Sequence, residues 1–347
     1  MRDGIDLGGE MSLPFPDPPA PGETVAIAPR LHWARMPLPL RLNHVNVWLM
    51  EEADGWTVVD CGLNTAETRA AWEALFTGSL RGRPIRRLVA THGHVDHIGL
   101  SGWLTSRYTA PFFATREAWL WARLGHARMG RPPSAESLSH LKAHGCDPEF
   151  VEAFAKDREP VLQLFAEQPQ SLIRVKDGDA LEMGGVRWDV HTADGHADEH
   201  ATFHSDASGI LIAGDQILQR ISPVVGVFGS EPLSDPLTDY LGSLPFYEAL
   251  PPHTLVLPSH GLPFYGLQRR IKELQRHHEE RLGQAMDALD KPRTATECAH
   301  VIFERAMAEG QWFLALAETL AHLHRLVTLK SVVRDIAADG VIRFAKA

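Results

Sequence analysis

The sequence predicts an α/β protein with a long helical insertion and a small helical module at its C-terminal end. Short β-type runs fall into two groups, over residues 24–60 and 186–257. Helical patterns lie between these groups and after the second one. The 347 residues are 44% hydrophobic, so the chain can bury the core of one large domain or of two ordinary ones.

Residues 1–23 are predicted to form a flexible, proline-rich arm. They contain no basic stretch followed by an apolar run, the pattern of a signal peptide or a membrane anchor. Instead they carry prolines at positions 14, 16, 18, 19 and 21. We therefore expect a cytoplasmic protein with no membrane partner.

The first group of β-type runs predicts a meander of strands, followed by a helix that Asn64 or Thr65 caps. A short buried strand, Arg87–Thr91, comes next. Residues 115–170 are polar and helical in pattern, and this segment is long for a connection inside a compact domain. We expect this insertion to cap or wall a site.

The second group comprises runs over residues 186–191, 201–205, 209–213 and 254–257. From Gln268 onward a long charged helix is followed by a second helix, which begins at the capping pattern of Thr294 and Glu297. A third helix precedes Asp339 and Gly340, the signal of a tight hairpin. Three helices and a hairpin predict a winged-helix-like domain over residues 268–347.

The charge of the chain argues against nucleic acid as a partner. The net charge is −10, and a field of that sign repels phosphate backbones. From residue 268 to the end, 13 Lys and Arg against 11 Asp and Glu give a net charge of +2, which leaves −12 for the rest. We expect a small-molecule substrate instead, and a homodimer is compatible with the sequence.

Four potential metal ligands follow the buried strand within six residues: His92, His94, Asp96 and His97. In an extended loop, alternate positions point the same way, so the first three are predicted to converge and His97 to join them nearby. Imidazole and carboxylate groups bind Zn²⁺ at about 2.0 to 2.2 Å without any thiolate. Further ligands are expected at later strand ends, and the candidates are His196, Asp215 and His260.

Two nearby residues receive other interpretations. The three cysteines lack C-x-x-C spacing, which excludes a thiolate zinc site, and Cys61 is interpreted as a small buried filler. His200 lies four residues after His196 and is interpreted as a packed or polar core histidine, with a hydrogen bond near the site as the alternative.

These motifs, in this order, resemble those of the metallo-β-lactamase superfamily over about residues 24–265. The resemblance includes Asp60 in the run Val-Val-Asp-Cys-Gly. It implies an αβ/βα four-layer sandwich, with residues 24–267 as the catalytic domain. Asp60 would then accept hydrogen bonds that orient ligand histidines.

The resemblance also implies a ligand set for two divalent metals. His92, His94 and His196 would hold one metal, and Asp96, His97 and His260 would hold the other. Asp215 would bridge the two. Zn²⁺ is the favoured metal, with Fe and Mn as alternatives.

Two cations about 3.5 to 4 Å apart can share a bridging hydroxide whose pKa falls to about 7. We therefore expect a metal-dependent hydrolase of the glyoxalase II-like or lactonase-like branch, which cleaves a small-molecule thioester, ester or lactone. Asp96 and Asp215 are predicted to hold the hydroxide. Candidates for substrate contacts follow metal-bearing strand ends: Arg220, Ser222 and Tyr265.

Two alternative activities would use the same residues. One is a phosphodiesterase or ribonuclease, since the C-terminal extension resembles that of ribonuclease members, although the acidic charge argues against RNA. The other is a mononuclear iron sulfur dioxygenase. An antibiotic-hydrolysing enzyme is disfavoured because those members typically carry Cys or His in place of Asp215.

Overall fold

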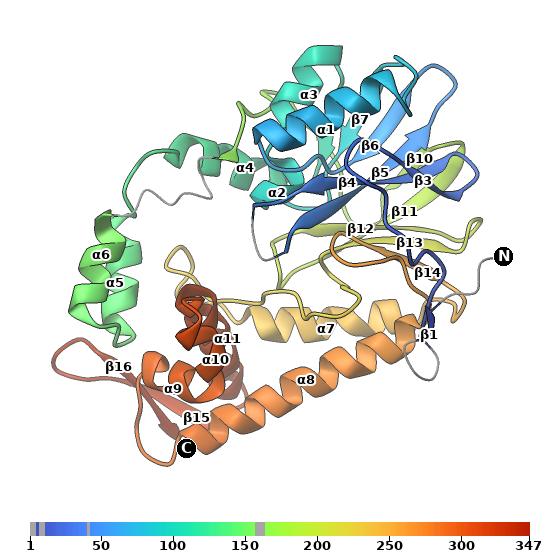
Figure 1. The fold of residues 1–347 in the computed structure, drawn as a ribbon. Helices are drawn as coiled ribbons and strands as arrows, with labels where there is room; N and C mark the ends of the chain where they lie inside the picture. The colour runs from blue at the N-terminus through green and yellow to red at the C-terminus, as the bar shows by residue number, and fades with distance from the viewer. Residues whose placement is uncertain (1–4, 7–10, 40–41, 157–163) are drawn as a thin grey trace.

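Two β-sheets lie between helices in the computed structural model, which describes residues 5–6, 11–39, 42–156 and 164–347 (Figure 1). The first sheet has its strands in sequence order and changes from antiparallel to parallel pairing at β6. Its strands are β3 (Val25–Ala28), β4 (Leu31–Pro37), β5 (His44–Glu51), β6 (Trp56–Val59), β7 (Ile85–Val89), β8 (Phe112–Ala114) and β9 (Ile173–Arg174).

The second sheet is antiparallel except for its last pair. Its strands are β10 (Ala180–Met183), β11 (Val186–Ala193), β12 (His200–Ser205), β13 (Ile210–Gly214) and β14 (Leu255–Pro258). Every residue of β12, β13 and β14 is buried, as expected for strands covered on both faces.

Three clusters of buried residues define four layers. One cluster lies between the sheets and joins Trp33 and Trp48 of the first to Trp188 and Phe203 of the second. A second cluster packs α1 (Ala66–Thr77), α3 (Ser101–Tyr108) and α4 (Arg116–Arg128) on the outer face of the first sheet. A third packs α7 (Pro236–Glu248) and α8 (Leu267–Ala288) on the second. Of the two predicted caps for α1, the side chain of Thr65 accepts the hydrogen bond, from the Thr68 amide.

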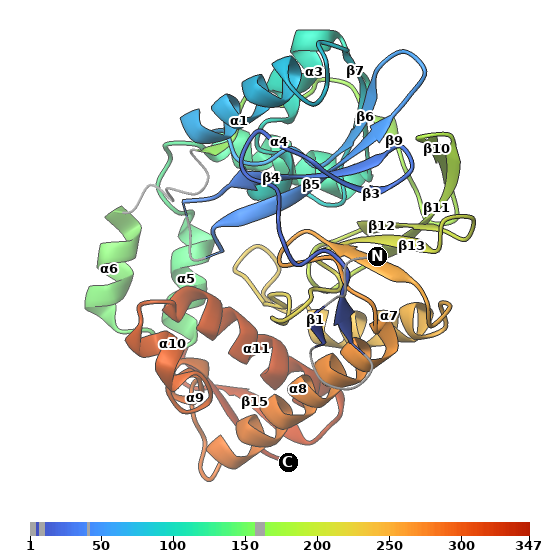
Figure 2. The same cartoon turned by 45° about the vertical axis from the view of Figure 1, so that its right-hand side comes forward.

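The predicted insertion contains α4, α5 (Ala135–Ala143) and α6 (Pro148–Lys156), which contact different parts of the molecule. Ala118 and Ala122 of α4 pack on the first sheet. By contrast, α5 and α6 lie beside the C-terminal helices in both ribbon views (Figure 2). The rings of Phe150 and Trp312 are 3.8 Å apart at this contact. The insertion therefore joins the first sheet to the C-terminal region.

The C-terminal region continues from α8 into three further helices and a hairpin. These elements are α9 (Ala295–Ile302), α10 (Glu304–Ala308), α11 (Trp312–Thr328), β15 (Val332–Ile336) and β16 (Ile342–Lys346). The predicted capping box is present: the Thr294 side chain accepts from the Glu297 amide, and Glu297 accepts from the Thr294 amide. Strands β15 and β16 pair antiparallel on either side of the predicted turn.

The prediction of a flexible N-terminal arm is wrong for the part that the structure describes. Strands β1 (Ile5–Asp6) and β2 (Ser12–Leu13) pair with each other. Ser12 also exchanges backbone hydrogen bonds of 3.3 and 3.0 Å with Tyr265. Met11 and Leu13 are buried in the core cluster beneath the second sheet. Burial of these two side chains offsets the entropic cost of ordering a proline-rich segment.

Among the helices described, none combines the length and the apolar character needed to cross a lipid bilayer.

Candidate metal centre

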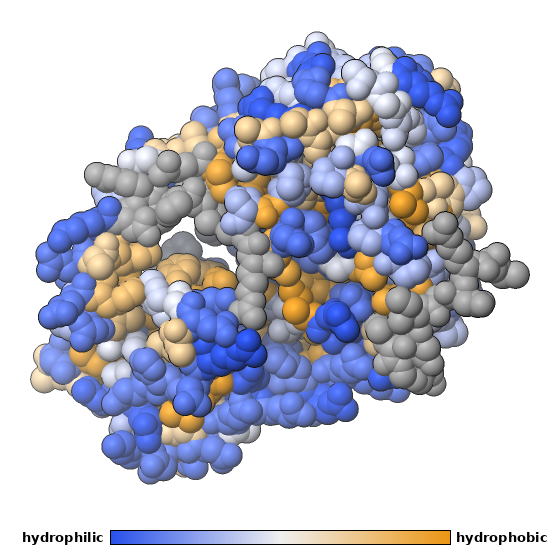
Figure 3. All heavy atoms as spheres, in the orientation of Figure 1, coloured by the Kyte–Doolittle hydropathy of each residue, from blue (hydrophilic) through white to orange (hydrophobic). Residues whose placement is uncertain are grey.

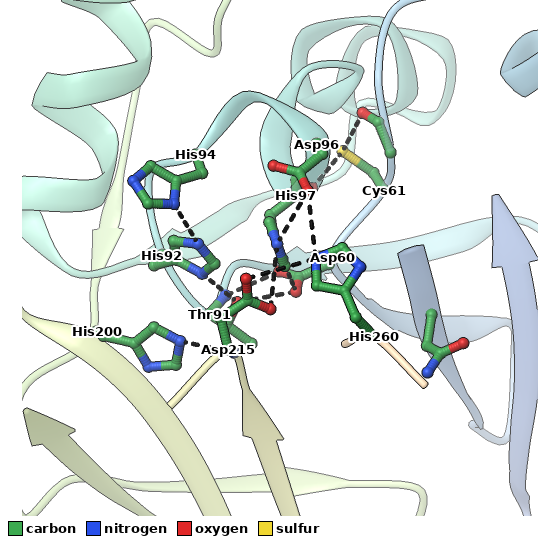
Figure 4. Close-up of polar contacts among 12 residues, drawn as sticks. Asp60, Cys61, Thr91, His92, His94, Asp96, His97, His200, Asp215 and His260 are labelled. Carbon is green, nitrogen blue, oxygen red and sulfur yellow. Dashed lines mark hydrogen bonds and ion pairs between the residues drawn. The ribbon is translucent and has the colours of Figure 1, made fainter. Parts of the chain in front are cut away.

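The predicted ligands all lie just after strands, and both sheets contribute (Figure 4). Asp60 follows β6 and the 92–97 cluster follows β7 in the first sheet. His196, Asp215 and His260 follow β11, β13 and β14 in the second sheet. The stacking of the two sheets therefore brings together residues that are far apart in the sequence.

The local conformation of the cluster differs from the extended loop expected. His94 is the N-cap of a single helical turn, α2 (Val95–Ile98), so Asp96 and His97 lie on a helix. The turn separates Asp96 from His92 and His94. Asp96 instead lies with His260, whose Nε2 is 3.4 Å from its Oδ2. The alternating side-chain directions of an extended loop therefore explain why His92 and His94 converge, but they do not explain the position of Asp96.

Among the described residues, three overlapping groups of three side chains form, and two of them are the sets that the family resemblance implies. The third group, His92, His97 and Asp215, links these two sets. Within each set the potential ligand atoms lie within 4.8 Å of one another. The first set is His92, His94 and His196, and the second is Asp96, His97 and His260.

Asp215 contacts both sets. Its Oδ2 lies 3.4 Å from Nε2 of His196 in the first set. The same oxygen is 3.4 Å from Nε2 of His260, and Oδ1 is 3.6 Å from Nε2 of His97, both in the second set. Asp215 therefore occupies the position that a bridging carboxylate requires.

These residues fit divalent metals in chemistry and in spacing. Two donors about 2.1 Å from one ion at a tetrahedral angle lie about 3.4 Å apart, close to the separations around Asp215. Three inward atoms are buried without a hydrogen-bond partner: His97 Nε2, His196 Nε2 and Asp215 Oδ1. Bound cations would satisfy all three of these atoms, which converge on the same site.

The outer nitrogens of the ligand histidines are held by the protein. Nδ1 of His196 lies 2.8 Å from the Val224 carbonyl, and Nδ1 of His260 lies 2.8 Å from the His44 carbonyl. A carbonyl only accepts, so each Nδ1 carries the proton and donates it. This tautomer leaves the Nε2 lone pair directed into the site.

Asp60 has the orienting position that the resemblance implies. Its Oδ2 lies 2.8 Å from Nδ1 of His97 and accepts a 2.8 Å hydrogen bond from the Thr91 hydroxyl, which is 3.0 Å from Nδ1 of His92. Asp60 is 1% exposed and has a left-handed backbone, with φ of 61°. A strained, buried carboxylate that contacts His97 directly and reaches His92 through the Thr91 hydroxyl is typical of a functional site.

The two sets differ in electrostatics. Burial, with a smaller contribution from His196, lowers the pKa of His94 to about 3. Burial also opposes a charge on His97, but the surrounding carboxylates outweigh it and raise the pKa of His97 to about 9. The first set therefore consists of neutral imidazoles, whereas the second holds protons that a bound cation would displace.

Two residues with no ligand role in the sequence interpretation support the site. His200 is buried, and its Nε2 accepts a 3.1 Å hydrogen bond from the Asp215 amide. A Cβ on Gly214 would lie 2.5 Å from the His200 ring, so only glycine permits this approach. Asn46 donates to the carbonyls of Pro258 and Gly261 at 2.7 and 3.1 Å, which fixes the loop that carries His260. No local motif marks this role of Asn46, because Pro258 and Gly261 are more than 200 residues away.

The contacts of Ser222 and Tyr265 lie outside the two ligand sets, and the substrate role of these two residues and of Arg220 stays a prediction. Arg220 is exposed, and Oγ of Ser222 lies 3.4 Å from Nε2 of His277 on α8. Tyr265 packs against the core cluster between the sheets. These residues follow metal-bearing strands, but their segments turn toward the C-terminal helix or the core. Cys61 is fully buried, and its thiol donates to the His97 carbonyl, as expected for a filler.

A cavity of about 470 Å³ opens beside His94 and His196. Its wall comes from α4, from the loop after β11, and from residues 226–239. Seven carboxylates line it: Glu117, Asp194, Asp198, Glu199, Glu231, Asp235 and Asp239. Its described lining includes neither lysine nor arginine.

Comparison with known proteins identifies the fold. The family model described as "Metallo-beta-lactamase superfamily" matches residues 40–260, and "Metallo-beta-lactamase-like, C-terminal domain" matches residues 282–347. The chain is 28% identical over 308 residues to the "Probable metallo-hydrolase YqjP" of Bacillus subtilis, covering 83% of this chain and 89% of the relative.

Two crystal structures resemble nearly the whole chain. A beta-lactamase domain protein from Burkholderia ambifaria is 39% identical, with a TM-score of 0.87 and 97% of each chain covered. A metallo-beta-lactamase family protein from Thermus thermophilus is 32% identical, with a TM-score of 0.76, covering 93% of this chain and all of its own. The chain therefore belongs to the metallo-beta-lactamase superfamily, as a metal-dependent hydrolase that also carries the C-terminal domain associated with that fold.

Proposed function

We propose that this chain is a binuclear hydrolase that cleaves an acyl bond in a small molecule, a thioester, ester or lactone. The observation that carries the proposal is the contact of one carboxylate, Asp215, with both sets of ligands. Zn²⁺ suits the imidazole and carboxylate donors, and Fe or Mn are the alternatives.

When bound, the metals supply a water nucleophile at neutral pH and a Lewis acid for the oxygen on which charge develops. The chain's own residues prepare the site for this chemistry. Asp60 fixes the ring of His97, and the carbonyls of Val224 and His44 fix His196 and His260. Asp96 and Asp215 face the second set, where they position the nucleophile.

The acidic cavity favours an uncharged acyl compound over a phosphodiester. Seven carboxylates and no lysine or arginine stand in the described lining next to His94 and His196, and of the seven Glu199 is paired with Arg174 at 3.0 Å, so the wall is acidic. A phosphodiester would bring a further negative charge against this wall. The same reasoning disfavours RNA, and it supports a glyoxalase II-like or lactonase-like activity.

We also propose that the winged-helix-like C-terminal domain closes the cavity region and does not bind nucleic acid. Its helix α11 contacts the inserted helices through Trp312, which supports this role. The full chain should show no salt-sensitive association with RNA or DNA in fluorescence anisotropy. Sub-micromolar binding that weakens with salt would contradict this role.

Elemental analysis and a substrate panel test the function. Metal-replete protein should contain two metals per chain, and one or none would contradict the binuclear site. Under identical metal loading, generic thioesters and lactones should be cleaved more efficiently than bis-p-nitrophenyl phosphate or single-stranded RNA. Faster phosphodiester cleavage would reverse the assignment, and oxygen consumption with a persulfide would indicate a sulfur dioxygenase.

A further inference from the structure

A second cavity, of about 500 Å³, adjoins the acidic one. The two cavities have Trp121, Phe228 and Ser230 in common in their walls. Because the first cavity opens beside His94 and His196, the second cavity lies next to the space that a ligand at the metal centre would occupy. Neither fold class nor ligand motif predicts this second space.

The second cavity is mostly apolar, with Arg128, Ser137, His140 and Ser230 as its polar lining, and it is built from separate parts of the chain. Helices α4, α5, α6 and α11 and the loop of residues 227–230 form its wall. Figure 3 shows an opening in this part of the molecule, with apolar residues at its left and lower edges. The apolar lining includes Leu124, Leu141, Phe154, Val227, Trp312 and Phe313.

Several of these apolar side chains are exposed to water. Leu124 is 49% exposed, Trp121 40% and Phe313 38%. Single exposed apolar residues are common, but these three line one concave surface. A ligand that covers them would remove apolar area from water, which favours binding.

We propose that the second cavity binds the hydrocarbon chain of the substrate's acyl group. This inference rests on the proposed function and adds the substrate class: an ester, thioester or lactone with a medium-length alkyl chain and no phosphate. The reacting carbonyl lies at the metal centre, and the alkyl chain passes Trp121 and Phe228. The acidic first cavity disfavours a substrate whose leaving group carries a charged phosphate before the bond is cleaved.

Hydrolysis of neutral p-nitrophenyl esters by the metal-loaded enzyme tests whether the cavity binds the alkyl chain of the substrate. From butanoate to octanoate, kcat/KM should rise about fourfold per methylene, the equivalent of about 0.8 kcal/mol for each buried CH₂. A flat or falling series would overturn the proposal. Octanoyl esters with a phosphate-bearing leaving group should be poorer substrates than neutral ones, and the opposite order would contradict the proposed effect of the acidic first cavity.

A matched pair of variants tests whether the second cavity is the source of the preference for longer acyl chains. Leu120 and Leu124 lie on α4 with 44% and 49% exposure, and of these two only Leu124 lines the cavity. Leu124→Glu should lower the ratio of kcat/KM for octanoate to that for acetate by at least about tenfold, whereas Leu120→Glu should keep the wild-type ratio. Equal ratios in the two variants would place the alkyl chain elsewhere.

Binding of a neutral probe separates this inference from the proposed reaction. The fluorescence of N-phenyl-1-naphthylamine should increase with wild type and Leu120→Glu, fall on addition of 1-octanol, and stay low with Leu124→Glu. If that pattern holds while no ester is cleaved, the cavity binds hydrocarbon but the proposed reaction is wrong. If esters are cleaved while the probe binds all three proteins equally, the reaction stands and the cavity assignment fails.

Discussion

The carboxylate of Asp60 lies 2.8 Å from Nδ1 of His97, with both side chains buried. This contact fixes the tautomer that directs Nε2 of His97 into the site. Asp60→Asn tolerates the left-handed backbone but loses the charge. We expect a loss of about 10- to 100-fold in metal affinity or in kcat/KM, because partners that orient ligand histidines have effects of this size.

The affinity of Asp60→Asn for Zn²⁺ can be measured by competition with a chromophoric chelator. The far-ultraviolet circular dichroism of the variant should match that of wild type, as a control for folding. Unchanged affinity and unchanged kcat/KM together would show that Asp60 does not orient the ligand.

Asp215→Ala removes the carboxylate that contacts both ligand sets. The variant should fold, because Asp215 follows a strand end and leaves the apolar core intact. Metal content should fall from two per chain to one or fewer. Loss of a Lewis acid worth several kcal/mol should lower kcat/KM by at least about 100-fold. Wild-type activity at wild-type metal content would show that Asp215 is not a bridge.

Asn46 couples the first sheet to the loop of His260, so Asn46→Ala should affect stability and metal binding together. Its Oδ1 accepts from Trp33 Nε1 at 2.8 Å, and its Nδ2 donates to the Pro258 carbonyl at 2.7 Å. Leaving such buried groups unpaired costs about 1 to 3 kcal/mol, to be measured by urea unfolding. Trp33→Phe removes only the first bond, so it should keep wild-type metal affinity. Equal metal affinity in wild type and Asn46→Ala would contradict the coupling.

Glu318 on α11 should give the folded chain a pH-dependent stability. Burial raises its pKa to about 7, although the nearby Arg281 guanidinium opposes this shift. Between its ordinary pKa of 4.5 and about 7, the folded chain keeps a proton that the unfolded chain releases. The contribution of Glu318 to the free energy of unfolding therefore decreases as pH rises through this window.

Glu318→Gln removes this dependence. Relative to wild type, the variant should gain at least about 1 kcal/mol in free energy of unfolding between pH 5 and pH 8, close to the value of one pKa unit. The difference between the urea unfolding free energies of wild type and Glu318→Gln cancels the pH effects that the two proteins share. Glu304→Gln, at an exposed glutamate, is a suitable control for the substitution itself. A difference that stays constant with pH would show that Glu318 is ionised throughout.

Much of the fold and of the ligand set could be predicted from local signals. The capping box of Thr294 and Glu297 involves residues three apart, and the 92–97 cluster lies within six residues, so both are visible in the sequence. The conformation of the 92–97 cluster could not be predicted in the same way. Ligands at every second position suggest an extended loop, whereas the chain forms the helical turn α2. The order of the strand-end motifs, rather than local geometry, led to the assignment of Asp96 and His260 to one set.

The features that sequence reasoning missed depend on contacts between distant segments. Asn46 meets the His260 loop only after the two sheets stack. A hydrogen bond of His200 near the site was an alternative, but its partner, the Asp215 amide, is set by pairing of β12 with β13. Arg220 and Ser222 were predicted as substrate contacts because they follow a strand that carries a metal ligand. Yet Arg270 of α8 binds the Leu218 and Ile221 carbonyls at 2.7 and 2.9 Å and holds that segment against the helix.

The core cluster beneath the second sheet continues without interruption into the C-terminal region. It includes Leu211 of β13, Leu274 of α8, Leu320 of α11 and Phe344 of β16, and it also takes in Leu13 near the N-terminus. The C-terminal domain is therefore not a detachable module. A chain shortened after α8 would expose one side of this cluster to water, so the two regions should unfold in a single cooperative step and tolerate exchange between relatives only as a unit.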